Sequence, residues 1–436
     1  MTTTDLIIIG AGPGGYRAAE YAAKKGLKVV IFEAENVGGT CLNVGCIPTK
    51  TYVHAANFDE ARERMAQVVS QLRSGVEGIL SHPNITLVRA HASFVDAHTV
   101  EAQPLPSLVE EGQEVGEVLY TAPNIIIATG SETKWLRLNH ADPRVVDSTG
   151  LLQFDTLPKR LCIIGAGVIG MEFASVFRRF GSEVTVIEYL KECLPALDSD
   201  IAKRLRKQME KEGITFYMQC AVKQIADGAV FFDDKKGKTQ SVEADVILMA
   251  TGRKPRTEGL NLEAAGITPA PNGAIPVDDN YQVSHLYAIG DVNGRQMLAH
   301  AAEMQAVRAV NHILGVADGI RFDIMPAAIF TEPEAACVGP TEDQLKEQGI
   351  AYICKKAFWR ANGKALAMNE SEGMLKLFVS QTDDRILGCH AYGAHSADIV
   401  QEVSALMCSD TTVEQLRDIV HIHPTLSEIL LAAAEA

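Results

Sequence analysis

Residues 5–15 read Asp-Leu-Ile-Ile-Ile-Gly-Ala-Gly-Pro-Gly-Gly, and this stretch decides the fold. The apolar run is short and uninterrupted, as expected of a parallel strand buried on both faces. A helical pattern follows from residue 16 to about 25, and a second apolar strand over 28–32 ends at Glu33. A strand, a glycine-rich turn, a helix and a strand ending in an acid form the dinucleotide-binding fingerprint.

The glycines of this turn have separate expected tasks. Gly10 makes the tight turn, Gly12 lets the backbone approach a pyrophosphate, and Gly15 lets the helix pack closely on the strand. Gly14 belongs to the same turn and is counted with the cofactor site. The helix N-terminus would face the phosphates, and Glu33 would accept hydrogen bonds from a ribose.

The same unit recurs over residues 161–188. Residues 161–170 read LCIIGAGVIG, a helical pattern spans about 171–180, and the strand 183–187 ends at Glu188. In both copies the acid lies 23 positions after the first glycine. One GxGxxG is weak evidence, but two complete copies are strong evidence of two sites. The binding residues of the second turn are expected to be Gly165, Gly167, Val168, Ile169 and Gly170.

A second internal echo supports the duplication. Residues 124–130 read NIIIATG and residues 246–252 read VILMATG, each a late strand running into a turn. Thr129 and Gly130 would border the first cofactor, and Gly252 the second. The class is therefore α/β, with two Rossmann-like domains, one inserted in the other. We expect the first over residues 1–143 and 256–322 and the second over 144–255.

The remaining segments carry no third fingerprint. Residues 58–82 have the spacing of a helix. Residues 323–436 mix strands with helices, one of them over about 397–407, and predict an α+β domain. Its expected task is packing or contact with a partner.

Bulk properties exclude several classes of function. A chain of 436 residues should form about three domains. The net charge of −15 argues against a nucleic-acid partner. The sequence has no run of about 18 apolar residues, so no membrane span is predicted, and its N-terminus does not have the pattern of a signal peptide. Nine cysteines, without zinc-ligand spacing, predict no metal site and a cytoplasmic location.

Residues 38–50 read GGTCLNVGCIPTK, with cysteines at 41 and 46. In a regular helix, positions five apart are separated by about 7.5 Å along the axis. That exceeds the usual Cα separation of a disulfide, roughly 4.4–6.8 Å. If the two pair, the backbone must leave the helix between them, and Gly45 allows this. Such a pair would be redox-active, and the alternative is two unpaired thiols.

Two dinucleotide sites and a dithiol together suggest an electron path. A hydride and a disulfide each carry two electrons, so a flavin is the natural mediator. The first fingerprint lies nearer the cysteines in sequence and should hold FAD. Gly39 and Thr40, directly before Cys41, are counted with that site. The second fingerprint should then hold the nicotinamide dinucleotide.

Over essentially its whole length, the chain resembles the pyridine nucleotide–disulfide oxidoreductases, and among them most the dihydrolipoamide dehydrogenases. The motif GGTCLNVGCIPTK is specific, and further matches are IGDV at 289–292, MLAH at 297–300 and HPTLSE at 423–428. The resemblance implies an FAD enzyme that oxidises protein-bound dihydrolipoamide with NAD. It implies a homodimer, with 323–436 as the dimerisation domain, and lipoyl domains of 2-oxoacid dehydrogenase or glycine cleavage complexes as partners.

The resemblance also implies roles around the cysteines. Cys46 would lie next to the flavin ring, and Cys41 would exchange with the substrate. Lys50 would lie near the flavin N5 and pair with Glu172. Without the surrounding motifs, Lys50 and Glu172 would be an ordinary surface pair.

Further roles fall on the later motifs. Asp291 would hold the ribityl chain of FAD, with the backbone near Ala299 close to the isoalloxazine. His423 would be the base that accepts protons from the dithiol, oriented by Glu428. The resemblance implies that this pair reaches the cysteines of the other subunit. A histidine before a proline is otherwise more often structural, and His421 is expected to be so.

Charge favours NAD over NADP. Glu188 would repel a 2′-phosphate, and Tyr189 and Leu190 offer no arginine to bind one. Lys191 is the nearby cation that counts against this preference. Reductases of glutathione and trypanothione are similar but typically carry basic residues here, and a tyrosine at position 168.

The chain departs from the family in being short between Tyr52 and Arg64, a region that borders the disulfide entrance in relatives. Two rival functions therefore stay open. One is an NAD(P)H-dependent reductase of another disulfide. The other is a flavoprotein that acts mainly as a binding subunit, against which the intact Cys41, Cys46, His423 and Glu428 argue.

Overall fold

The computed structural model describes residues 1–105, 118–138 and 141–436. The chain divides into two compact units. The first comprises Met1–Tyr52, Asp59–Lys134 and Gly252–Ile320, and the second Val53–Phe58, Trp135–Thr251 and Arg321–Ala436. The long middle segment of the second unit is thus inserted in the sequence of the first. The finer division into four segments stays a prediction.

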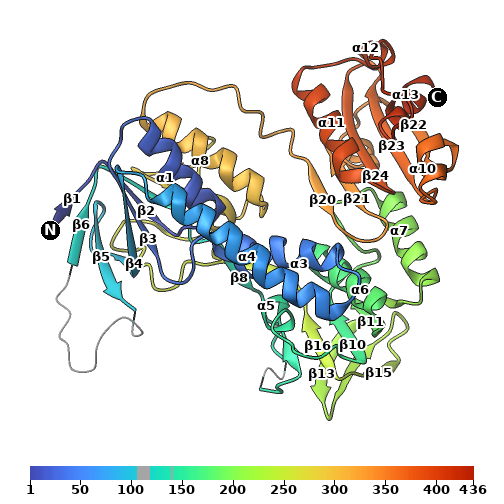
Figure 1. The fold of residues 1–436 in the computed structure, drawn as a ribbon, viewed down its shortest axis with the longest axis horizontal. Coiled ribbons are helices and arrows are strands. Elements are labelled where there is room, and N and C mark those ends of the chain that lie inside the picture. Colours follow the sequence, from blue (N-terminus) through green and yellow to red (C-terminus); the bar gives the residue numbers. More distant parts are fainter. Residues whose placement is uncertain (106–117, 139–140) are drawn as a thin grey trace. The chain divides into compact units, whose positions relative to one another are not determined.

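The first unit is built on a nine-stranded sheet in the order β1-β6-β5-β4-β3-β2-β7-β19-β18. Figure 1 labels the strands β1 to β6 of this sheet. Ile7 of β2 lies opposite Val30 in β3 and Ile125 in β7, in parallel register. Their uninterrupted apolar sequences fit this doubly covered position. The strands are β1 (Thr2–Thr3), β2 (Leu6–Ile9), β3 (Val29–Glu33), β4 (Ile85–Phe94), β5 (Thr99–Pro104), β6 (Val118–Thr121), β7 (Asn124–Ile127), β18 (Gln282–Val283) and β19 (Leu286–Ala288).

Helices α1 and α8 of the first unit pack against each other. A separate antiparallel pair, β8 with β17, completes the unit. The remaining elements are α1 (Pro13–Lys24), α2 (Gly39–Val44), α3 (Cys46–Val53), α4 (Phe58–Leu80), β8 (Ser131–Thr133), β17 (Arg253–Pro255), the 3₁₀ turn η2 (Gly290–Asn293) and α8 (Ala299–Ile313).

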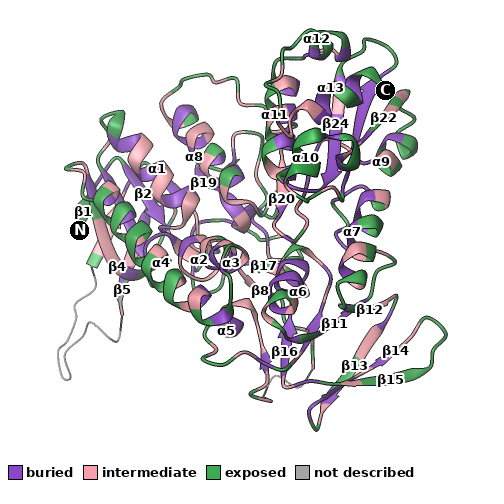
Figure 2. Ribbon diagram, turned by 45° about the vertical axis from the view of Figure 1, so that its right-hand side comes forward, coloured by how far each residue is buried: buried purple, intermediate pink, exposed green. Residues whose placement is uncertain are grey.

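The second unit contains the repeat of the fingerprint. Its parallel sheet has the order β12-β11-β10-β16-β9, beside an antiparallel sheet β13-β14-β15. The inner strand β16, like β2 of the first unit, is buried along its length (Figure 2). The elements are β9 (Val145–Val146), α5 (Ser148–Leu151), β10 (Arg160–Ile164), α6 (Val168–Phe180), β11 (Glu183–Glu188), α7 (Ser199–Lys211), β12 (Thr215–Met218), β13 (Ala221–Ala226), β14 (Ala229–Asp233), β15 (Thr239–Glu243) and β16 (Val246–Met249).

The C-terminal part of the second unit is an antiparallel sheet, β20-β21-β24-β23-β22, covered by helices. Its core surrounds the fully buried Trp359, whose Nε1 donates to Ala394 O at 3.1 Å. The elements are β20 (Ala327–Ile329), β21 (Ala335–Val338), α9 (Glu342–Glu347), β22 (Tyr352–Phe358), the 3₁₀ turn η3 (Trp359–Ala361), α10 (Gly363–Ala367), β23 (Met374–Ser380), β24 (Ile386–Tyr392), α11 (Ser396–Cys408), α12 (Val413–Arg417) and α13 (Glu428–Glu435).

The predicted α/β class, with two Rossmann-like folds and a C-terminal α+β domain, is confirmed. Helix α4 matches the helix expected over 58–82, and α11 the one expected over about 397–407. Among the described residues, the helices are all too short or too polar to cross a membrane.

Candidate active site

The first glycine turn follows β2, and little space surrounds two of its glycines. Gly10 has φ +102°, and a Cβ there would lie 2.5 Å from Ala128 O. A Cβ on Gly15 would lie 1.8 Å from Gly10 O, so glycine is required at both places. Gly12 is open by comparison, since only the Cα of Gly39 comes within 4 Å, at 3.9 Å. Because Gly39 begins α2, the helix with Cys41 starts directly against this turn.

Gly14 also lies where α1 meets α8, while its place in the cofactor site stays a prediction. A Cβ there would meet Ile289 Cδ1 at 3.2 Å and Ala302 Cβ at 3.3 Å. Its lack of a side chain allows α1 to pack closely on α8.

The second turn repeats this geometry. Gly165 has φ +106°, and a Cβ there would lie 2.4 Å from Ala250 O. A Cβ on Gly170 would lie 2.0 Å from Gly165 O, whereas Gly167 has no neighbour of this kind within 4 Å. Val168 and Ile169 open helix α6, where Val168 is exposed. In each turn, the first and the last glycine of the GxGxxG pattern leave no room for a side chain, and the middle glycine is open.

The acids at the strand ends hold both turns. Glu33 Oε2 accepts from Ala11 N at 2.8 Å, and its Oε1 accepts from the amide two residues further on at 2.7 Å. Glu188 repeats both contacts, with Ala166 N at 2.6 Å and the later amide at 2.7 Å. Burial raises the pKa of Glu33, and these amide donors oppose the rise. Each carboxylate oxygen keeps a second lone pair for a ribose hydroxyl.

These features fit two dinucleotides. The N-termini of α1 and α6 have no side-chain cap, so their first amides remain as donors for phosphate oxygens. Gly130 and Gly252 follow the equivalent strands β7 and β16, have positive φ, and have open space where a Cβ would stand. Thr129 fixes the first of these turns by donating to Arg256 O at 2.6 Å. The residues present therefore match a dinucleotide at each turn.

The two cysteines lie on either side of a break in the helix. Helix α2 ends before Gly45, which has φ −136° and ψ −110°, and α3 begins at Cys46. A Cβ on Gly45 would lie 2.9 Å from Thr40 O, so the break needs a glycine. The side chains of Cys41 and Cys46 lie within hydrogen-bonding reach of each other. The expected departure from a regular helix is found, while pairing as a disulfide stays a prediction.

The surroundings of Cys41 disfavour its thiolate. The hydrogen bond with Cys46 and burial raise the pKa of Cys41, Lys50 lowers it, and the charge of Glu303 raises it. Tyr16 donates to Glu303 Oε1 at 3.3 Å. Burial, Glu303 and Cys41 also raise the pKa of Tyr16. Neither Tyr16 nor Glu303 is among the residues predicted from sequence, although Tyr16 directly follows the first glycine turn and Glu303 lies three positions after the motif at 297–300.

Asp291 lies in the turn η2, which precedes helix α8 in the sequence. Ser131 Oγ donates to Asp291 Oδ2 at 2.5 Å. Gly290 N donates to Gln305 Oε1 at 2.7 Å, which ties the turn to α8. Ala299 is the first residue of that helix. The residues expected to border the flavin thus lie within one unit, at the ends of neighbouring elements.

The C-terminal pair is in contact. His423 Nδ1 lies 2.9 Å from Glu428 Oε1, and Thr425 N donates to Glu428 Oε2 at 2.8 Å. These two contacts hold the pKa of Glu428 below its usual value. The His423 side chain is 79% exposed. His421 is different, because its side chain is 4% exposed and its Nε2 lies 3.2 Å from Glu402.

Glu172 is buried in α6 and accepts from Phe330 N at 2.9 Å. Lys50 is on α3, in the other unit. Their pairing stays a prediction.

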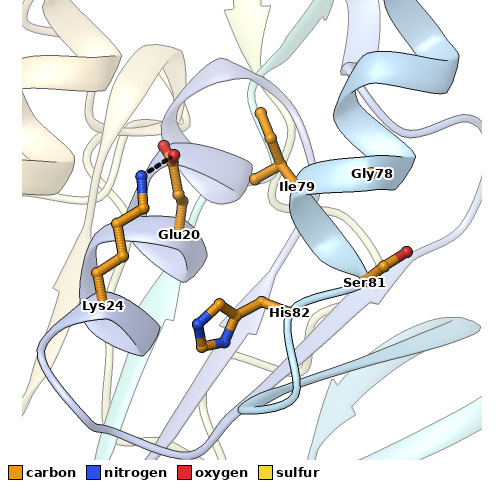
Figure 3. Close-up of a pocket in the computed structure, with 6 residues that line it drawn as sticks. All are labelled: Glu20, Lys24, Gly78, Ile79, Ser81 and His82. Atoms are coloured by element: carbon orange, nitrogen blue, oxygen red, sulfur yellow. Dashed lines mark hydrogen bonds and ion pairs between the residues drawn. The ribbon is translucent and has the colours of Figure 1, made fainter.

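Two surface hollows of the described structure lie away from these residues. One of about 250 Å³ is lined by α1 and the end of α4, with the Glu20–Lys24 ion pair (2.5 Å) on one wall (Figure 3). Its other lining residues are Gly78, Ile79, Ser81 and His82. It contains none of the expected site residues.

Comparison with known families fits this geometry. Residues 4–306 match the model of the pyridine nucleotide-disulphide oxidoreductases, and residues 325–434 match the dimerisation domain of that family. The chain belongs to the pyridine nucleotide-disulphide oxidoreductase family. The family uses FAD and a pyridine nucleotide, which confirms the predicted cofactors. The match to the dimerisation domain supports the predicted homodimer.

Individual relatives point to two activities. The chain is 36% identical over 463 residues to mitochondrial dihydrolipoyl dehydrogenase of Pisum sativum, covering 99% of this chain and 91% of that protein. Dihydrolipoyl dehydrogenase of Staphylococcus aureus is 36% identical over 458 residues, covering 99% and 96%. The solved copper(II) complex of the HOCl-induced flavoprotein disulfide reductase RclA from Escherichia coli matches with a TM-score of 0.91 at 31% identity, covering 100% and 99%.

Proposed function

We propose that this flavoprotein disulfide oxidoreductase oxidises protein-bound dihydrolipoamide to lipoamide, with NAD as the electron acceptor. The observation that carries the proposal is the contact between His423 and Glu428 at 2.9 Å, in a chain that also holds the Cys41–Cys46 dithiol. Oxidising a dithiol requires a group that accepts its protons near neutral pH, and a carboxylate-oriented imidazole meets that need. The identity with two dihydrolipoyl dehydrogenases supports the choice of substrate.

The reaction balances with these groups. In the oxidised enzyme, the first substrate thiol gives its proton to His423, and the resulting thiolate attacks the Cys41 sulfur of the Cys41–Cys46 disulfide, so that Cys46 leaves as a thiolate. The second substrate thiol then attacks the substrate sulfur of the mixed disulfide, which closes the lipoamide ring, and Cys41 leaves with the proton of that thiol. Bound FAD would carry the electron pair and one proton, together equivalent to a hydride, to NAD as the Cys41–Cys46 disulfide re-forms, and His423 would release the other proton to solvent.

The contact with Glu428 defines which nitrogen of His423 acts. When Nδ1 carries the proton and donates to the carboxylate, Nε2 has the free lone pair and serves as the base. Glu428 also stabilises the imidazolium that forms, since its carboxylate is held ionised by Thr425 N. The roles of Lys50 and Glu172 beside the flavin, and of Asp291 on its ribityl chain, are part of this proposal.

The preference for NAD rests on Glu188. Its carboxylate is held by two backbone amides at the end of β11, where a 2′-phosphate would meet its negative charge. We further propose that the enzyme acts as a homodimer in the cytoplasm, with lipoyl domains of 2-oxoacid dehydrogenase or glycine cleavage complexes as partners. The nine cysteines, an odd number scattered along the chain, fit that location.

A second candidate is favoured by the region after the dithiol. Only residues 54–57 connect α3 to α4, and the reductase RclA, at 31% identity, has nearly the same extent as this chain. This supports the alternative of an NAD(P)H-dependent reductase that acts on another disulfide.

A paired assay tests both candidates. Purified holoenzyme should reduce NAD with dihydrolipoamide at a much higher kcat/KM than it oxidises NADH or NADPH with glutathione disulfide. NADP in place of NAD should lower the rate. Turnover with another disulfide and none with dihydrolipoamide would reject the first candidate in favour of the second.

A further inference from the structure

The strands β8 and β17 stand where the chain passes between its two units. The chain leaves the first unit after Lys134 and returns to it at Gly252, so both passages directly adjoin this antiparallel pair. Backbone hydrogen bonds close its ends, from Lys134 N to Gly252 O at 3.0 Å and from Arg256 N to Gly130 O at 3.0 Å. These bonds hold the β8–β17 pair in place within the first unit.

Side chains on one face of the β8–β17 pair connect to Asp291 through hydrogen bonds. Arg253 Nε donates to Ser131 Oγ at 2.7 Å, and its Nη2 donates to Ser131 O at 2.6 Å. The Ser131 hydroxyl in turn donates to Asp291 Oδ2, and Arg253 Nε lies 4.0 Å from the same oxygen. Ser131, at the centre of this chain of contacts, is 3% exposed, while the side chains of Arg253 and Asp291 are 18% and 25% exposed. Among the described residues, no donor binds Asp291 Oδ1.

The opposite face carries an ordinary surface pair. Side chains alternate between faces along a strand, and in this register Lys254 lies opposite Glu132. Their ion pair is 2.7 Å long, with side chains 50% and 36% exposed. It joins the same two strands without contacting Asp291, which makes it a matched control.

We propose that Ser131 and Arg253 are positioning residues for FAD, which aim the Asp291 carboxylate at the ribityl chain. Ser131 fixes one carboxylate oxygen and leaves the other for the ligand. Arg253 fixes the Ser131 hydroxyl, because its guanidinium holds both the side chain and the backbone carbonyl of that serine.

The charges around Asp291 fit this role. Burial raises the pKa of Asp291, while the hydrogen bond from Ser131 and the charge of Arg253 oppose the rise. From α8, the side chain that meets this turn is the uncharged Gln305. From β17 it is Arg253, since Lys254 on the same strand faces Glu132. An ionised carboxylate accepts hydrogen bonds from hydroxyls with both oxygens, and protonation removes part of that capacity.

This inference concerns retention of FAD and does not depend on the substrate proposed above. It rests on Asp291 as the ligand of the ribityl chain. Asp291→Asn tests that assignment by itself, because the amide keeps the shape and loses the charge.

The experiment measures the dissociation constant of FAD from the full-length protein, by flavin fluorescence after equilibrium dialysis at pH 6 to 8. Ser131→Ala and Arg253→Gln should each weaken FAD binding about tenfold, which corresponds to ~1.4 kcal/mol. Ser131→Thr, which keeps the hydroxyl, should restore most of the affinity. Glu132→Gln and Lys254→Gln should bind FAD as the wild type does.

The pH profile separates positioning from a general loss of structure. Without Ser131 or Arg253, the pKa of Asp291 rises, so the loss of FAD affinity on acidification should begin at a higher pH than in the wild type. Unchanged affinity and profile in Ser131→Ala and Arg253→Gln would overturn the proposal, as would equal losses in the control pair. If Arg253→Gln does not fold, the comparison of Ser131→Ala with Ser131→Thr decides. Unchanged affinity in Asp291→Asn would reject the ribityl assignment itself.

Discussion

Cys41 is the residue at which the proposed chemistry meets the substrate, and its surroundings keep it protonated. Hydrogen bonding to Cys46 and burial raise the pKa of Cys41, and the charge of Glu303 adds to this. The sequence could identify the two cysteines and the glycine between them, because these lie within one motif. It could not place Glu303 or Tyr16, since their hydrogen bond joins positions 287 residues apart.

The substitution Glu303→Gln should make the Cys41 thiol more reactive toward an alkylating reagent. The change removes a negative charge near the thiol, so the pKa of Cys41 should fall and its thiolate fraction near neutral pH should rise. The measurement is the rate of iodoacetamide adduct formation on Cys41 of the reduced protein, followed by mass spectrometry from pH 6 to 9. Glu20→Gln, a carboxylate of the neighbouring helix α1 paired with Lys24, is the control. A curve for Glu303→Gln that overlays the wild type would contradict the expectation.

At the scale of elements, the strands and helices of the two fingerprints followed from sequence, because their periodicity and glycine spacing are local. A buried charged cluster in the second unit did not. Lys376 on β23 contacts Asp198 at the start of α7 at 2.7 Å and Glu342 on α9 at 2.5 Å. Asp198 N also donates to His390 Nδ1 at 3.0 Å. These residues are up to 192 positions apart, so only the packing of the elements brings them together.

His390 should make this region sensitive to acid. Burial lowers the pKa of His390 from 6.5 to about 4, with Lys376 acting in the same direction and Asp198 and the carbonyls of Gly339 and Pro340 opposing it. Between these values the unfolded chain binds a proton that the folded chain does not, so stability falls as the pH drops through this window. The loss between pH 7 and pH 5 should be on the order of 2 kcal/mol.

Denaturant unfolding of the wild type and His390→Gln at pH 7 and pH 5 measures this contribution. The variant should have lower stability at pH 7 but a smaller further loss at pH 5. His91→Gln, at an exposed position of β4, should keep the pH dependence of the wild type. An equally large acid loss in His390→Gln would show that other groups cause it.

For the whole molecule, duplication within the sequence was the informative signal. The repeated fingerprints and the echo at 124–130 and 246–252 predicted that one nucleotide-binding fold is inserted in another, which the segments of the two units reproduce. The C-terminal domain carries no such repeat. Its role as a dimerisation domain was implied by the family resemblance, because an interface between subunits leaves no local pattern comparable to a glycine turn.

The proposed partnership between subunits makes a specific prediction for mixed dimers. If His423 of one subunit serves the cysteines of the other, a Cys46→Ser subunit joined to a His423→Gln subunit contains one intact site and one doubly altered site. Each homodimeric variant should be nearly inactive with dihydrolipoamide and NAD. Heterodimers isolated by two different affinity tags should recover about half of the wild-type activity, and an unsorted equal mixture about one quarter, since half of its dimers are mixed. A heterodimer as inactive as both parents would place His423 and the cysteines of each site on the same chain. Because one intact site in a mixed dimer needs residues from two chains, recovery of half of the wild-type activity would also show that the dimer is the catalytic unit.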